Sequence, residues 1–127
     1  MQQDLEANKR SAIDFYRTAC LGDPELAVER YVGTEYVQHN PEVADGTTGF
    51  IEYFTEMARD YPDKRIEFLR AVAEDDLVAL HTHQTWPGGD EYVTMDFFRF
   101  DEDGKIVEHW DAIQSVPAAS KSGNPVY

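Results

Sequence analysis

A cluster of histidines and aspartates between residues 81 and 111 is the part of this sequence most suited to chemistry. Its members are His81, His83, Asp96, His109 and Asp111. An aspartate can remove a proton next to a carbonyl group, and an imidazole can donate a hydrogen bond to the enolate oxygen that forms. Both side chains also bind zinc or iron(II), but the sequence contains no HExxH or CxxC motif. We therefore expect acid/base chemistry without a cofactor or metal, with a His/Asp metal site as the less favoured alternative.

These residues lie in segments that have the composition of β-strands. The four segments are rich in Val, Ile, Thr and aromatic side chains and span residues 65–74, 77–86, 91–100 and 105–116. The connections between them are short enough for β-hairpins. The second half of the chain therefore predicts an antiparallel meander.

The symmetry of the hairpin loops would decide which residues of this sheet are opposite one another. Symmetric loops over residues 87–90 and 101–104 would pair His81 with Asp96, His83 with Thr94, Asp96 with His109, and Thr94 with Asp111. Because side chains alternate along a strand, the five ionisable groups would then share one face. A bulge near Gly104 would change the last two pairings.

The opposite face of the predicted sheet would be apolar. It would carry Trp86, Met95, Trp110, Val78 and Leu80. If helices cover the polar face, this apolar face needs another cover, and large exposed apolar patches usually mark interfaces. We therefore expect a homodimer through the face that bears Trp110, Met95 and Trp86. The alternative is that the helices cover the apolar face and leave the histidines and aspartates in water.

Helical patterns precede the strands. Apolar residues recur at helical spacing from Leu5 to Leu21, and Asp23-Pro24 can begin a second helix that ends near Val32. Residues 35–39 indicate a brief extended segment, and Thr47 or Thr48 can cap a third helix that ends before Pro62. Helices followed by a meander predict an α+β fold, with the helices packed on one face of the sheet.

Asp111 is the preferred candidate for the catalytic base, because an apolar cavity strengthens a carboxylate as a base. His109 or His81 would donate a hydrogen bond to the enolate oxygen. Asp96 is the third candidate catalytic residue, although a carboxylate between two histidines would orient their rings more readily than react. A structural hydrogen bond or ion pair is the competing interpretation for all of them.

The candidate substrate contacts are polar on one side and aromatic on the other. They are His81, His83, Phe98, Phe50 and Phe54. For the phenylalanines of the third helix, core packing is the stronger interpretation. If aromatic rings fill the cavity, a non-catalytic protein that binds a small molecule becomes the alternative to an enzyme.

Composition limits the partners of this chain. Its 127 residues carry a net charge of −14, which opposes binding to nucleic acids and to anionic membranes. The sequence has no apolar run long enough for a membrane span and no secretory pattern at residue 1, so we expect a cytoplasmic protein. Its one cysteine, Cys20, is interpreted as a buried apolar side chain. We expect a single domain over residues 1–127, of which 118–127 form a C-terminal tail.

Three segments of the chain resemble a known family. They are YVQHNP (36–41) followed by Asp45-Gly46, DFFR (96–99), and GKIVEHWDAIQ (104–114). Together they resemble the SnoaL-like group of polyketide cyclase relatives, in the nuclear transport factor two-like superfamily. The resemblance extends over residues 5–117.

The resemblance implies a cone formed by a curved antiparallel sheet around a long helix, with an internal pocket and frequent dimerisation. It also implies an intramolecular aldol condensation that uses an aspartate and no cofactor, and Asp111 is the position that matches this aspartate. His39 would lie at the cavity mouth and contact the ligand. The substrate does not carry over, because this fold also supports isomerases, hydrolases, dehydratases and non-catalytic binders.

Overall fold

Three helices and five strands form the part of the chain that the computed structural model describes, residues 3–88 and 90–127. In chain order they are α1 (Leu5–Cys20), α2 (Pro24–Tyr31), β1 (Val32–Gln38), α3 (Gly46–Asp60), β2 (Arg65–Glu74), β3 (Leu77–Thr85), β4 (Glu91–Phe100) and β5 (Ile106–Ser115). The predicted order of helices and strands is confirmed. The expectations for Met1, Gln2 and Gly89 lie outside the described residues. None of the helices described is long and apolar enough to cross a membrane.

Short polar side chains begin the first two helices, and the cap of the second helix at Asp23 was predicted. Asp4 accepts a hydrogen bond from the N–H of Ala7 at 3.0 Å, and Asp23 accepts one from Leu26 at 3.2 Å. The third helix differs, because it begins at Gly46 and its N-cap residue is Asp45 rather than a threonine. The Asp45 carboxylate accepts from the backbone N–H of Gln38 at 2.9 Å, so it holds the end of β1 instead of capping α3.

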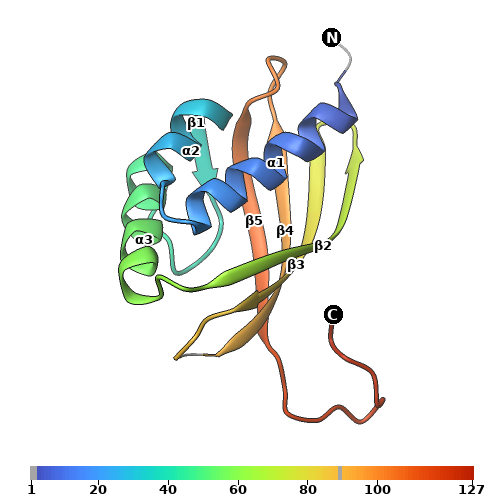
Figure 1. Cartoon of the computed structure of the whole chain (residues 1–127). Coiled ribbons are helices and arrows are strands. Elements are labelled where there is room, and N and C mark those ends of the chain that lie inside the picture. The colour runs from blue at the N-terminus through green and yellow to red at the C-terminus, as the bar shows by residue number, and fades with distance from the viewer. Residues whose placement is uncertain (1–2, 89) are drawn as a thin grey trace.

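The five strands form one sheet in the order β1-β5-β4-β3-β2. Strands β2 to β5 are antiparallel, as predicted. The brief extended segment is a fifth strand, β1, which pairs in parallel with β5 at the edge of the sheet and makes the sheet mixed (Figure 1). This pairing brings residues 32–38 beside residues 106–109.

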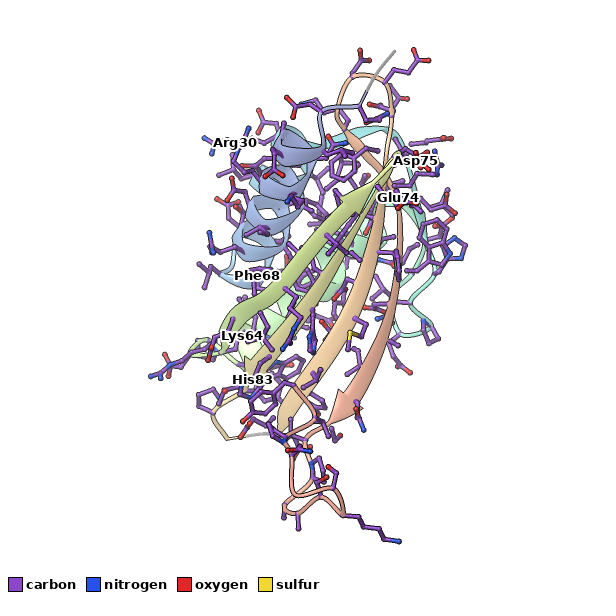
Figure 2. The ribbon with its side chains drawn as sticks, turned by 90° about the vertical axis from the view of Figure 1, so that its right-hand side faces the viewer. Arg30, Lys64, Phe68, Glu74, Asp75 and His83 are labelled. Atoms are coloured by element: carbon purple, nitrogen blue, oxygen red, sulfur yellow. The ribbon has the colours of Figure 1, made fainter. Side chains whose placement is uncertain are left out.

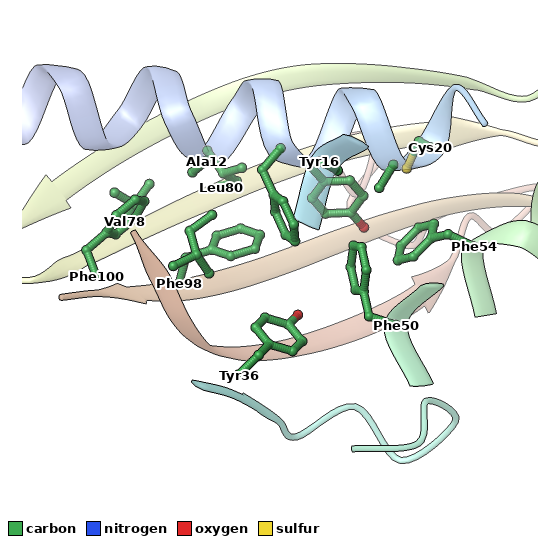
Figure 3. Packing of buried hydrophobic residues seen from close by; sticks show 14 of the residues in the cluster. Ala12, Tyr16, Cys20, Tyr36, Phe50, Phe54, Val78, Leu80, Phe98 and Phe100 are labelled. Carbon is green, nitrogen blue, oxygen red and sulfur yellow. The ribbon is translucent and has the colours of Figure 1, made fainter. Parts of the chain in front are cut away.

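The helices cover one face of this sheet. Figure 1 shows α1 crossing the sheet, with α2 and α3 beside it near β1. The apolar side chains that helical spacing predicts for α1 are all buried, namely Ala12, Phe15, Tyr16, Ala19 and Cys20. They pack against Val78, Leu80 and Phe98 from the strands (Figure 3). Burying a phenylalanine side chain contributes about 1.5–3 kcal/mol, so this aromatic layer is a main source of stability.

The register between β3 and β4 differs from the prediction by one residue. His81 pairs with Met95 and His83 pairs with Val93, and the N–H of Trp86 bonds the carbonyl of Asp90 at 3.2 Å. A symmetric four-residue loop would instead place Trp86 opposite Glu91, one residue further along β4. Because side chains alternate, a slip of one residue moves every side chain of a strand to the other face. The prediction that His81 and His83 share a face with Asp96 is wrong.

The register between β4 and β5 is shifted by two residues, so it keeps the predicted face. Asp96 pairs with Asp111 and Phe98 pairs with His109, and the register shifts between Arg99 and Phe100. A shift of two preserves the side on which each side chain lies. Asp96, His109 and Asp111 therefore face the helices together.

No helix among the described residues lies over the other face of the sheet (Figure 2). Met95 and Phe97 are 48% and 47% exposed there, and Trp110 is half-buried beside Phe97. Trp86, which we expected on this face, lies instead on the face toward the helices, because the register slip moved all of β3. At one end of the outer face the ring of His83 stacks on Tyr127 with 4.1 Å between ring centroids.

Candidate active site

A cavity of about 250 Å³ lies between the sheet, α1, α3 and the segment that follows β1. Its wall is mostly aromatic and apolar, and consists of Phe15, Tyr16, Tyr36, Val43, Phe50, Tyr53, Phe54, Met57, Trp86, Tyr92, Phe98 and Ile113, with the polar residues Gln38, Asn40, Gln84, Thr94, His109 and Asp111. Among the described residues that line it there is no lysine or arginine. Asp111 and His109 lie in this wall, as do all three phenylalanines expected from the sequence.

Asp111 is held by one asparagine. Asn40 Nδ2 lies 2.8 Å and 2.9 Å from the two carboxylate oxygens of Asp111, and the Asp111 side chain is 7% exposed. The Asn40 side chain is fixed in turn, because its Oδ1 accepts the backbone N–H of Glu42 at 2.8 Å. Each carboxylate oxygen has a second lone pair, so Asp111 remains able to accept a proton.

His109 is engaged at both ring nitrogens. Nδ1 lies 2.7 Å from Gln38 Oε1, and Nε2 lies 2.9 Å from Asp96 Oδ1 and 3.9 Å from Asp111 Oδ2. Gln38 Oε1 also accepts the backbone N–H groups of His39 and Asn40, so this oxygen is an acceptor and His109 Nδ1 carries a proton. His109 therefore has no nitrogen left to donate directly to a ligand.

Asp96 lies behind His109 and outside the cavity wall. The side chain is buried, and Thr94 Oγ1 donates to Asp96 Oδ2 at 2.5 Å. The contact between Asp96 Oδ1 and His109 Nε2 requires one proton, carried by either partner. Burial raises the pKa of the Asp96 carboxyl, and the hydrogen bond from His109 opposes part of that rise. Asp96 is placed to orient His109 rather than to contact a substrate.

Three histidines that we expected at the site point elsewhere. His39 stacks on Trp110 with 4.9 Å between ring centroids and lies 2.7 Å from a carboxylate oxygen of Glu108. His81 Nδ1 lies 2.9 Å from Arg70, and His83 Nε2 lies 2.6 Å from Glu91. None of the three lines the cavity in the described part of the chain, so their predicted position in the pocket is wrong.

Sequence reasoning assigned no role to Tyr36, Gln38 or Asn40. All three line the cavity. Gln38 bonds both Tyr36 and His109, and Asn40 bonds Asp111. They belong to the YVQHNP segment, which was recognised only as part of a family resemblance. Their role depends on the parallel pairing of β1 with β5, which joins segments about 70 residues apart and leaves no local sequence signal.

Of the five histidines and aspartates that the sequence offers as metal ligands, three lie close enough together to hold one ion. One ligand atom from each of Asp96, His109 and Asp111 lies within 4.8 Å of the others. Imidazole and carboxylate suit zinc or iron(II), so the donor types fit. However, a metal would have to replace the proton between His109 and Asp96, and the outward-facing His81 and His83 could not contribute.

Gly49 sets the position of the segment that carries Asn40. A Cβ atom at residue 49, in the first turn of α3, would overlap the carbonyl oxygen of Ala44. We expect Gly49→Ala to lower the free energy of unfolding by about 1–3 kcal/mol, because the backbone must move to relieve the overlap. Urea denaturation would measure the change, with Glu52→Ala on the exposed side of the same helix as the control. Equal stability of the two variants would contradict this role of Gly49.

Comparisons with solved structures show where this fold has been seen before. TsrD from Streptomyces laurentii aligns with a TM-score of 0.74 at 19% identity, over 89% of this chain and 92% of that one. A proposed polyketide cyclase from Bacillus cereus ATCC 10987 aligns with a TM-score of 0.74 at 18% identity, over 85% and 74%. A proposed ketosteroid isomerase from Kribbella flavida DSM 17836 aligns with a TM-score of 0.70 at 17% identity, over 93% and 83%. At these identities the likeness establishes the fold.

Family membership follows from the sequence itself. No curated protein matches the chain significantly. The model of the SnoaL-like domain, in contrast, matches residues 12–109, which is well over half of the chain and includes β1, α3 and the start of β5. The predicted resemblance and the α+β fold are both confirmed. This chain belongs to the SnoaL-like domain family.

Proposed function

We propose that this protein is a cofactor-independent acid/base enzyme, a cyclase or isomerase that acts on a small, neutral, partly apolar carbonyl compound. The observation that carries the proposal is the position of Asp111, a carboxylate fixed by Asn40 in the wall of an otherwise mostly aromatic cavity. The names of the similar cyclase and isomerase structures agree with this reaction class.

The charge of the cavity supports a neutral substrate. Asp111 contributes a carboxylate, and the described wall holds no lysine or arginine that could pair with an anionic ligand. A carboxylate or phosphate group would be desolvated beside Asp111 without compensation, which is unfavourable. The aromatic side chains would hold the apolar part of the molecule.

In this mechanism Asp111 is the general base. One of its oxygens takes a proton from the carbon next to the substrate carbonyl, and the C–H electron pair forms a carbon–carbon double bond while the carbonyl oxygen becomes an enolate. In an isomerase, Asp111 returns the proton to another carbon of the substrate. In an aldol cyclase, the enolate carbon attacks a second carbonyl group of the same molecule, and the alkoxide that forms takes up the proton held by Asp111.

Exchange of hydrogen for deuterium tests the proposal without knowledge of the natural substrate. 2-Tetralone is a neutral bicyclic ketone with acidic α-protons, and NMR in D₂O measures their exchange. We expect the protein to accelerate this exchange above the buffer rate. If the ketone binds and exchange is not accelerated, the protein is the non-catalytic binder that the sequence left as the alternative.

Association of two copies through the outer sheet face remains our prediction for the assembly. Met95 and Phe97 are each about half exposed there, and the buried Nε2 of His81 has no hydrogen-bond partner among the described residues. We expect the wild-type protein to be a dimer and Met95→Glu to be a monomer in native mass spectrometry, because the charge would be buried at the interface. Leu21→Glu, at an exposed site at the end of α1, is the control. A monomeric wild-type protein would contradict the prediction.

Absence of nucleic-acid and membrane partners and a cytoplasmic location also remain predictions. The net charge of −14 supports the expected absence of nucleic-acid and membrane partners.

A further inference from the structure

The polar groups in the cavity wall differ in whether they have hydrogen bonds left to make. Both ring nitrogens of His109 are engaged, by Gln38 and by Asp96. One N–H of the Asn40 amide is directed at the Asp111 carboxylate, and the amide oxygen accepts the N–H of Glu42. His109 therefore cannot donate to a ligand without losing a bond inside the protein.

The other end of the polar wall is also saturated. Gln84 Nε2 donates to the Tyr16 hydroxyl at 3.0 Å and to Thr82 at 3.2 Å, and its oxygen accepts from Trp86 at 3.1 Å. Thr94 donates to Asp96, as described above. The tyrosines of the cavity therefore offer hydroxyl donors that Gln84 and Thr94 do not.

Tyr36 combines burial with an unused donor. It is 6% exposed, lines the cavity, and its hydroxyl oxygen accepts from Gln38 Nε2 at 3.2 Å. A phenol hydroxyl has one proton to donate, and among the described residues this proton has no acceptor in the protein. The ring packs against Phe15 and Phe50, which fixes its position (Figure 3).

The bonds behind Tyr36 strengthen it as a donor. His109 donates to the oxygen of Gln38, and the amide of Gln38 donates to Tyr36, so a chain runs from Asp96 through His109 and Gln38 to the phenol. Hydrogen bonds in such a chain polarise one another. Burial also raises the pKa of the Tyr36 hydroxyl well above its ordinary value, so the group stays protonated.

We infer that the Tyr36 hydroxyl, rather than His109, donates the hydrogen bond that holds the carbonyl oxygen of a neutral ring ketone bound beside Asp111. The role of this hydrogen bond in catalysis rests on the proposed function. When Asp111 takes the α-proton, the negative charge moves to the oxygen that Tyr36 already contacts, and Tyr36 keeps its own proton. His109 and Asp96 are positioning residues that act through Gln38.

The size of the cavity indicates one or two rings. A cavity of about 150 Å³ accommodates benzene, and the cavity here measures about 250 Å³. 2-Tetralone, with one aromatic ring fused to a cyclic ketone, meets both the size and the charge conditions. It serves as the probe for this inference as well as for the exchange assay.

Infrared difference spectroscopy of 2-tetralone labelled with ¹³C at the carbonyl tests the hydrogen bond directly. We expect the carbonyl stretch of the bound ketone to lie at lower wavenumber than in an apolar solvent, and this shift to be lost in Tyr36→Phe. Tyr31→Phe is the matched control, because Tyr31 also packs against Phe15 but does not line the cavity. We expect the exchange rate of Tyr36→Phe to fall by about 10²–10³-fold, with a much smaller loss of ketone affinity.

The possible outcomes separate this inference from the proposed function. A shift that persists in Tyr36→Phe, or one that is lost only in Tyr53→Phe, would overturn the assignment of Tyr36. Absence of ketone binding to the wild-type protein would overturn the ligand class. A shift lost in Tyr36→Phe together with no exchange in the wild-type protein would support Tyr36 as the ligand contact and refute the enzyme. If Tyr36→Phe fails to fold, 3-fluorotyrosine at residue 36 should move the stretch further to lower wavenumber, and an unchanged stretch would overturn the inference.

Discussion

Asp111→Asn should lower the rate of α-proton exchange in 2-tetralone by about 10³-fold while the protein still folds and still binds the ketone. Asparagine has nearly the shape of aspartate but cannot accept the α-proton. It also keeps an oxygen toward which Asn40 Nδ2 can donate. The expected loss is therefore in the chemical step rather than in the architecture of the cavity.

Two measurements make this result interpretable. Infrared spectra of the bound ketone should show the same shift in Asp111→Asn as in the wild-type protein, because Tyr36 is unchanged. Asp103→Asn removes the same charge at an exposed turn between β4 and β5 and should leave exchange at the wild-type rate. Retention of wild-type exchange in Asp111→Asn would remove this residue from the mechanism.

Asp96→Ala should lower the free energy of unfolding by about 3–5 kcal/mol, the usual cost of removing one partner from a buried ionisable pair. The substitution leaves His109 Nε2 and the hydroxyl of Thr94 without their partner in a buried region. Asp96→Asn is the matched variant. Its amide can donate to His109 Nε2 while its oxygen accepts from Thr94, so we expect most of the stability to remain. Urea denaturation measures both variants, and equal losses would contradict the role of this hydrogen-bonded pair.

The difference in free energy of unfolding between the wild-type protein and Asp96→Asn should change with pH in one direction. Burial raises the pKa of Asp96 in the folded protein above its ordinary value of 3.8. Between that value and the raised pKa, the folded state holds a proton that the unfolded state has lost, so the stability contributed by Asp96 falls as pH rises. The stability of the wild-type protein relative to Asp96→Asn should therefore decrease from about pH 4 upward and level off above the raised pKa. A constant difference across this range would contradict the shift.

Much of the fold could be predicted because the signals are local. The burial of Ala12, Phe15 and Tyr16 follows from helical spacing, and the cap at Asp23 follows from a short side chain placed before Pro24. The strands β2 to β5 follow from runs of β-forming residues between turns. These patterns depend on neighbours within a few residues, which a sequence displays directly.

The register of the hairpin between β3 and β4 could not be predicted from local sequence signals. Turn-forming residues at 87–90 predict a loop, but they do not fix which backbone groups close it. The observed bond from Trp86 to Asp90 changes the register by one residue. That single residue sends His81 and His83 to the outer face and brings Trp86 into the cavity wall.

The sequence by itself determined the order of the helices and strands, the apolar face of α1, and the shared face of His109 and Asp111, since residues two apart on a strand point to the same side. Only the tertiary structure decided the composition of the site. The parallel pairing of β1 with β5 places Gln38 beside His109 and brings Asn40 to Asp111. Periodicity reports which side of its own element a residue occupies, whereas strand pairing depends on backbone hydrogen bonds between distant segments, and those form only when the whole chain folds.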